Sequence, residues 1–151
     1  MALLPLTCSA NLLKIGDSLP HVAIAETGIA VLEGESVSYQ PWNIAALAKG
    51  QPHLVQSMAA RPIAAEMSKA FTDQFDGSDI HVTKIVNADD APFGAGMFIS
   101  GSIEKTKLSN PAIDSVIDDD GEFAAAIQQD EANSLIILLD KSSKVVYFKE
   151  G

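Results

Sequence analysis

The chain has 151 residues, a formal net charge of −10 and a hydrophobic fraction of 47%. Its length is that of about one domain, and a domain of this size buries enough surface to be stable without a metal ion or a disulfide. The negative charge argues against binding to nucleic acid or to anionic lipid, because both select clusters of Lys and Arg. No stretch reaches the ~20 apolar residues of a membrane span, so we expect no membrane insertion.

The first ten residues, MALLPLTCSA, are apolar and end in small side chains. Cys8 and Ala10 occupy the two recognition positions of a signal-peptidase site before Asn11, although the usual positive charge is absent. We interpret residues 1–10 as the remnant of a signal peptide and residues 11–151 as a single domain. A frayed terminus or a short edge segment is the alternative. Cleavage would remove Cys8, the single cysteine, and a chain without thiols suits an oxidising compartment.

Short strands are predicted before residue 50. Residues 19–24 and 29–32 are apolar on either side of Thr27-Gly28, which predicts two strands joined by a turn. Val37 and Tyr39 alternate with polar residues and predict an edge segment. Residues 43–48 are expected to form one helical turn.

Strands and helices alternate in the middle of the chain. Residues 52–58 and 80–87 predict strands. Pro62 suits the first turn of a helix, and apolar residues at helical spacing extend that helix to Phe75. A loop rich in Gly and Asp follows at 88–102, and a second helix begins near Met97 or Ser102 and ends before Pro111.

The last part of the chain predicts strands at 112–117, 134–140 and 144–149, the last two forming a hairpin. The acidic residues 118–122 lack the ligand spacing of an EF-hand and are interpreted as a solvated turn between strands. Right-handed crossovers make 52–58 and 80–87 parallel neighbours, so Ala60–Pro62 should face the loop after Asn87. The fold class is therefore α/β.

The order of these elements resembles a thioredoxin-like fold, which has three α/β/α layers and a mixed central sheet. Thiol oxidoreductases of that superfamily carry Cys-x-x-Cys at the corner that residues 60–63 form here. Ala60 and Ile63 take the two cysteine positions, so the corner cannot act as a thiol–disulfide oxidoreductase or a peroxiredoxin. Thioredoxin folds finish with a helix, which would begin where this sequence stops at Gly151. Either the chain is truncated there, or one sheet face is left uncovered, which would favour a homo-oligomer.

Four stretches resemble the YtfJ family of bacterial secreted proteins, whose biochemical role is not established. They are Pro41-Trp42-Asn43, the corner AARPIAAEM, IVNADDAPFGAGMF at 85–98 and LIILLDKSSKVVYFKEG at 135–151. The resemblance covers residues 15–151, and the segment 85–98 is its most specific part. It implies a thioredoxin-like fold and a periplasmic location.

Arg61, the only arginine, is the leading candidate for a binding residue. It stands where a helix begins, and the helix dipole disfavours a cation there unless a negative partner is present. One interpretation is a small anion or carboxylate held by Arg61 and the free N–H groups of the helix. The other is an internal salt bridge from Arg61 to Asp89 or Asp90.

The remaining candidate binding residues are Asp89, Asp90, Trp42 and Gly94. Asp89 and Asp90 point in opposite directions on an extended chain, so they make a poor acid and base pair; one is expected to face Arg61 and the other to cap a turn. Trp42 could equally anchor the edge segment in the core, and Gly94 could serve a tight loop.

No metal or cofactor is expected. The three histidines are scattered and have no cysteine partner, and Gly94-Ala95-Gly96 is too short for a dinucleotide fingerprint. The sequence thus favours a redox-inactive periplasmic binding protein whose partner is a protein or a small anion. The alternative is an enzyme acting on a small acidic substrate, with Arg61 as electrostatic stabiliser and Asp89 or Asp90 as base.

Overall fold

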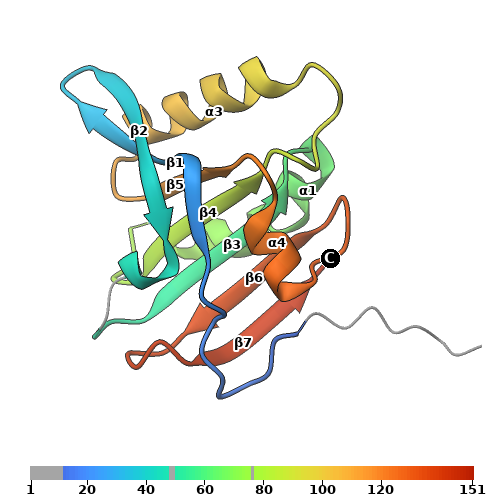
Figure 1. The fold of residues 1–151 in the computed structure, drawn as a ribbon. Coiled ribbons are helices and arrows are strands. Elements are labelled where there is room, and N and C mark those ends of the chain that lie inside the picture. Colours follow the sequence, from blue (N-terminus) through green and yellow to red (C-terminus); the bar gives the residue numbers. More distant parts are fainter. Residues whose placement is uncertain (1–11, 48–49, 76) are drawn as a thin grey trace, which may run out of the picture.

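The computed structural model describes residues 12–47, 50–75 and 77–151, so the expected signal-peptide remnant lies outside the described residues. Seven strands form one sheet in the order β2-β1-β5-β4-β3-β6-β7 (Figure 1). The strands are β1 Ala23–Glu33, β2 Ser36–Asn43, β3 His53–Ala59, β4 His81–Asn87, β5 Asp114–Asp118, β6 Ser134–Leu139 and β7 Val145–Glu150. The α-helices are α1 Pro62–Met67, α2 Lys69–Thr72, α3 Gly96–Ser109 and α4 Glu122–Ile127, with 3₁₀ turns at Ile44–Ala46 and Asp73–Phe75.

The sheet is mixed, as the sequence predicted. β3, β4 and β5 are parallel, whereas β1, β2, β6 and β7 join them in antiparallel pairs. Every residue of β3 is buried, as expected for a central strand covered on both faces. Ala59 pairs with Asn87, so the carboxyl ends of β3 and β4 lie side by side.

Helices cover both faces of the sheet and complete the three-layer α/β/α architecture. On one face, Phe123 and Ile127 of α4 pack with Val55. On the other face, Ala64 of α1 and Ile103 of α3 pack in one apolar cluster, and α2 and the following turn cover a second. Figure 1 shows α4 in front of the sheet and α1 behind it.

The expected turn at Thr27-Gly28 is wrong, because both residues lie inside the long strand β1. The pairing of β1 with β2 shifts between Ile24 and Ile29, which marks a bulge. Thr27 and Gly28 have φ values of 54° and 80°. A Cβ on Gly28 would lie 2.1 Å from the carbonyl oxygen of Gln40, so the glycine permits a close approach of two strands rather than a chain reversal.

The helix predicted from Pro62 to Phe75 is interrupted at Ser68. The hydroxyl of Ser68 is buried, accepts a hydrogen bond from Nε2 of Gln56 at 2.6 Å and lies 2.7 Å from Oγ of Ser134. These contacts draw the chain towards the sheet and separate α1 from α2.

The turn predicted at residues 118–122 is present at Asp119-Asp120, but it leads into the short helix α4 and not into a strand, and its first residue is buried. Asp118 is buried, and its carboxylate accepts hydrogen bonds from the N–H groups of Glu122 at 3.0 Å and Phe123 at 2.9 Å. The carboxylate thus satisfies the free donors at the start of α4. The spacing of Phe123 and Ile127 was a signal of this helix.

The far edge strand β7 is partly exposed. Val146 and Tyr147 are 44% and 40% exposed, whereas Val145 is buried against the core. The expected self-association through this region stays a prediction.

Candidate functional site

The corner between β3 and α1 places Arg61 at the carboxyl edge of the sheet. Pro62 is the first residue of α1, where its missing N–H is no loss. The N–H of Ala60 donates to the carbonyl of Asn87 at 3.1 Å, which ties the corner to the end of β4. Ile63, at the second cysteine-like position, is 62% exposed.

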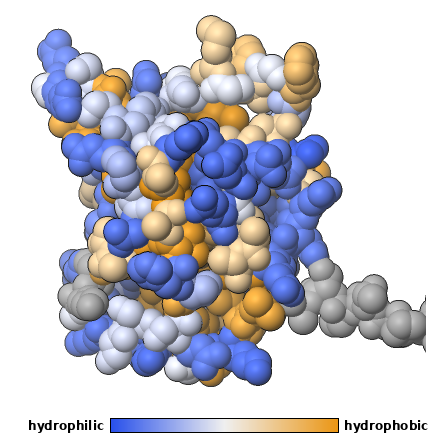
Figure 2. Space-filling model, in the orientation of Figure 1, coloured by the Kyte–Doolittle hydropathy of each residue, from blue (hydrophilic) through white to orange (hydrophobic). Residues whose placement is uncertain are grey.

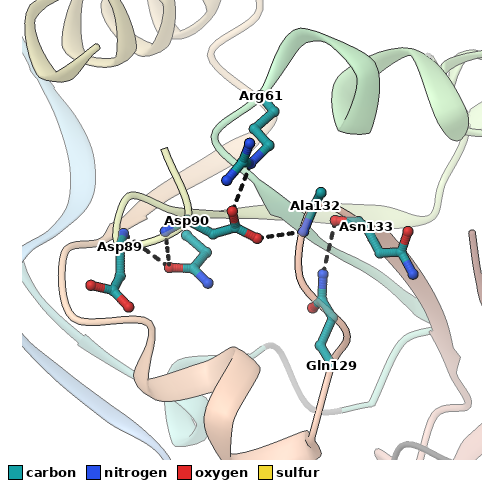
Figure 3. A network of polar contacts seen from close by, with 7 residues as sticks. Arg61, Asp89, Asp90, Gln129, Ala132 and Asn133 are labelled. Atoms are coloured by element: carbon teal, nitrogen blue, oxygen red, sulfur yellow. Dashed lines mark hydrogen bonds and ion pairs between the residues drawn. The ribbon is translucent and has the colours of Figure 1, made fainter. Parts of the chain in front are cut away.

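Arg61 forms an ion pair with Asp90. Its Nε lies 2.7 Å from Oδ1 of Asp90, and the two side chains are 39% and 11% exposed (Figure 3). The other oxygen, Oδ2, accepts the N–H of Ala132 at 2.5 Å. The internal salt bridge is therefore the interpretation that the structure bears out, with Asp90 as the partner.

Asp89 points away from this pair (Figure 3). Its side chain is exposed, and its N–H and that of Asp90 both donate to Oδ1 of Asn87, at 3.1 and 3.3 Å. Both oxygens of Asp90 are already hydrogen-bonded, so Asp90 is not a free base. The enzymatic alternative needs Arg61 as electrostatic stabiliser and Asp89 or Asp90 as base, and here Arg61 and Asp90 are already bonded to each other while Asp89 points away from them.

An apolar groove of about 400 Å³ opens beside Arg61, and its size is within the range of small-molecule sites. The ends of β3 and β4 form its floor, and α1 and α3 form its walls. Small side chains such as Ala60, Ala65 and Ala95 leave the space open. The lining residues are Met58, Ala59, Ala60, Arg61, Pro62, Ala65, Val86, Pro92, Ala95, Phe98, Ile99, Ser102 and Ile103.

Large exposed apolar side chains lie in the segment 92–99, which also carries several of the residues that line the groove. Phe93 is fully exposed, and Met97 and Phe98 are 88% and 81% exposed. Figure 2 shows apolar side chains gathering at the top of the molecule, over α3. Exposed apolar patches of this kind mark interaction surfaces. Sequence reasoning missed the groove, although the run from Pro92 to Ile99 is rich in apolar residues for a loop.

A second hollow, of about 180 Å³, lies on the other side of Arg61 and is polar. Its lining residues are Arg61, Asn87, Asp89, Asp90, Ala124, Gln129, Asp130 and Glu131. The lining thus contains four acidic residues and one arginine, which is an unfavourable environment for an anion.

Two of the sequence candidates are not brought into either hollow. Trp42 is buried in the core with Ile24 and Leu47, which matches its structural alternative as an anchor. Gly94 is exposed in the loop before α3 with φ of 79°, and its neighbour Ala95 lines the groove. Gly94 thus shapes the loop without lining the groove itself.

Burial shifts the pKa values of two side chains outside the groove, His53 and Asp118. Desolvation lowers the pKa of His53 to about 4, and the neighbouring His81 acts in the same direction while Asp114 opposes it. Desolvation raises the pKa of Asp118, and hydrogen bonds from Phe123 and Glu122 oppose that shift. His53 lies at the opposite end of β3 from the corner.

Neither a metal-binding cluster nor a membrane-spanning helix is found in the part of the chain that the structure describes. No cluster of three or more His, Cys, Asp or Glu side chains is placed to hold a metal ion among these residues. None of the helices in the described ranges is both long and apolar enough to cross a membrane.

Solved structures place the fold among thioredoxin-like proteins. The thioredoxin domain of a thiol-disulfide oxidoreductase from Bacteroides vulgatus matches 91% of this chain and 89% of its own, with a TM-score of 0.63 and 14% identity. A hypothetical protein from Sinorhizobium meliloti matches 92% of this chain and 72% of its own, with a TM-score of 0.61 and 15% identity. These identities show the fold alone.

Sequence relatives are uncharacterised bacterial proteins. One from Haemophilus influenzae is 37% identical over 147 residues, which cover 94% of this chain and 79% of the relative. The uncharacterised protein YtfJ of Escherichia coli is 33% identical over 154 residues, covering 99% of this chain and 83% of the relative. A family model described as bacterial protein of unknown function (YtfJ_HI0045) matches residues 13–151. The chain therefore belongs to the YtfJ_HI0045 family of bacterial proteins and has a thioredoxin-like fold.

Proposed function

We propose that this protein is a redox-inactive binding protein of the bacterial periplasm, and that its groove holds an apolar segment of a partner polypeptide. The single observation that carries the proposal is the apolar groove at the corner where thioredoxin-like oxidoreductases carry their cysteines. Ala60 and Ile63 occupy those positions, so the corner keeps a recess for a partner without a nucleophile.

A polypeptide suits this surface better than a small ligand. A small ligand would fill the groove and leave Phe93 and Met97 in water, because neither residue lines it. A polypeptide segment would occupy the groove and extend beyond it over neighbouring apolar side chains such as Phe93, which follows the lining residue Pro92. Burial of such apolar area is worth about 25 cal/mol per Å² before the costs of association.

The binding test uses a short neutral peptide with Leu-Phe-Leu at its centre and Ser and Gly elsewhere, titrated calorimetrically into the protein. Ala65→Trp fills the groove from an exposed position of α1. Ala70→Trp is the matched control, since Ala70 is equally exposed on α2 and does not line the groove. We expect Ala65→Trp to abolish binding and Ala70→Trp to retain it. Equal binding by both variants would refute the proposal.

Two further measurements test the redox inactivity and the periplasmic location. In an insulin-reduction assay with a thiol reductant, the protein is expected to give the uncatalysed rate; catalysis above that rate would contradict redox inactivity. The periplasmic location rests on the apolar segment that ends at Cys8 and Ala10. An alkaline phosphatase fusion to the full chain in its native host should be active, because that enzyme requires disulfides that form outside the cytoplasm.

A further inference from the structure

We propose that the partner segment carries a basic side chain next to its apolar one, and that the basic side chain enters the polar hollow on the far side of Arg61. This inference rests on the proposed function, because it names the partner chemistry of the same groove. Arg61 lines both the apolar groove and the polar hollow, so the two recesses lie next to each other on the two sides of its side chain. One extended segment could therefore occupy both.

The hollow is acidic after its internal ion pair is taken into account. Asp90 neutralises Arg61 and is itself held by the N–H of Ala132. Asp89 and Glu131 then remain around the hollow, and they give it an excess of negative charge. Asp89 and Glu131 are exposed, and within the described residues neither carboxylate has an ion-pair partner.

The loops that carry these carboxylates are fixed by hydrogen bonds. The side chain of Asn87 accepts the N–H groups of Asp89 and Asp90. On the opposite loop, Nε2 of Gln129 donates to the carbonyl of Asn133 at 3.1 Å (Figure 3). The same nitrogen donates to the carbonyl of Ser57 at 3.2 Å. The backbone of both loops is thus ordered before any partner arrives, which lowers the ordering cost of binding.

The negative charge of the protein favours a positively charged partner segment. The whole chain has a net charge of −10, so a cationic segment is attracted at long range and an acidic one is repelled. A carboxylate ligand on Arg61, the interpretation open from sequence alone, would have to displace Asp90 and sit among the other carboxylates. An apolar segment flanked by Lys or Arg satisfies the groove and the hollow together.

Three peptides with the same Leu-Phe-Leu centre test this partner chemistry, flanked by Lys, by Ser or by Glu. Calorimetric titration is run at about 50 mM and about 300 mM salt, because exposed charges are screened at the higher concentration. The Lys-flanked peptide is expected to bind about threefold to tenfold more tightly than the Ser-flanked one, as for two partly exposed ion pairs. That advantage should shrink at high salt, and the Glu-flanked peptide should bind least.

Two double variants test whether the tighter binding of the Lys-flanked peptide comes from the polar hollow. Asp89→Asn with Glu131→Gln removes two charges from the hollow. Glu35→Gln with Asp79→Asn removes two exposed charges from turns that do not line it. The first pair should cancel the advantage of the Lys-flanked peptide and leave the Ser-flanked peptide unchanged, while the second pair should preserve both.

The outcomes separate the inference from the proposed function. If the Ser-flanked peptide binds as tightly as the Lys-flanked one and Ala65→Trp still blocks it, the groove stands and the basic partner is wrong. If both double variants weaken the Lys-flanked peptide equally, the effect comes from overall charge and the hollow is not the site. If Ala65→Trp changes the binding of none of the peptides, the proposed function fails and this inference fails with it.

Discussion

Asp90 holds Arg61 through one carboxylate oxygen and the Ala132 N–H through the other, so a single side chain connects the corner before α1 to the loop before β6. The pair leaves Arg61 without a free charge to offer a ligand. It also forms the partition between an apolar groove and an acidic hollow.

Mutation can distinguish the contribution of the Asp90–Arg61 ion pair from that of the hydrogen bond between Asp90 and the Ala132 N–H. Asp90→Asn keeps an acceptor for Ala132 but removes the ion pair, and it should cost no more than about 1 kcal/mol because Arg61 is partly exposed. Asp90→Ala also leaves the Ala132 N–H unpaired and should cost about 1–3 kcal/mol. Urea denaturation measures both. Equal losses in the two variants would mean that the Ala132 hydrogen bond contributes nothing.

Gly28→Ala should be strongly destabilising. The added Cβ would meet the backbone carbonyl of Gln40 at 2.1 Å, at a φ of +80° that side chains rarely adopt. Gly34→Ala is the matched control, because Gly34 has a φ of +66° and nothing within 4 Å of its Cβ. The control should lose only the backbone strain of about 1–2 kcal/mol, and Gly28→Ala clearly more, by urea denaturation. Similar losses would argue against the close contact of β1 with β2.

Stability should fall on acidification because of His53. Its folded pKa is about 4, whereas an unfolded histidine titrates near 6.5, so between these values only the unfolded state binds the proton. The free energy of unfolding should therefore decrease as pH falls from about 6.5 to about 4, by up to about 1.4 kcal/mol per pH unit from this group. Above pH 6.5 this contribution is constant.

His53→Gln tests the assignment of that slope. It removes the titration and keeps a polar group near Thr83, whose Oγ1 lies 2.8 Å from Nε2 of His53. His21→Gln is the control, since His21 is exposed. Urea denaturation at several pH values should show a flatter dependence for His53→Gln alone. An unchanged slope would assign the acid sensitivity to other groups.

Asp118→Ala should destabilise the fold by about 1–3 kcal/mol. It leaves the N–H groups of Glu122 and Phe123 without their acceptor at the start of α4. Asp120→Ala removes an exposed carboxylate from the same acidic run and should stay within about 0.5 kcal/mol of the wild type. Thermal unfolding compares the two, and equal effects would exclude a capping role for Asp118.

Local sequence patterns correctly predict those strands and helices that are specified by the residues within them. The apolar run of β3, Pro62 at the start of α1 and the parallel pairing of β3 with β4 are confirmed. The predictions are wrong where the local structure depends on a contact with a residue distant in sequence. Gly28 was read as a turn because its contact, the carbonyl of Gln40, belongs to another strand. The helix after Pro62 breaks because Ser68 finds Gln56 and Ser134, which are also distant in sequence.

Composition alone establishes that residues 60–63 contain no cysteine and that the chain is acidic, because composition does not depend on folding. The sequence also indicated an α/β domain, because hydrophobic periodicity is a local property. The pairing of Arg61 with Asp90 rather than Asp89 follows from the folded chain, since it depends on the turn at Asn87 and on Ala132. The apolar groove likewise arises only when α1 and α3 are packed over the ends of β3 and β4, because no single segment contains its walls.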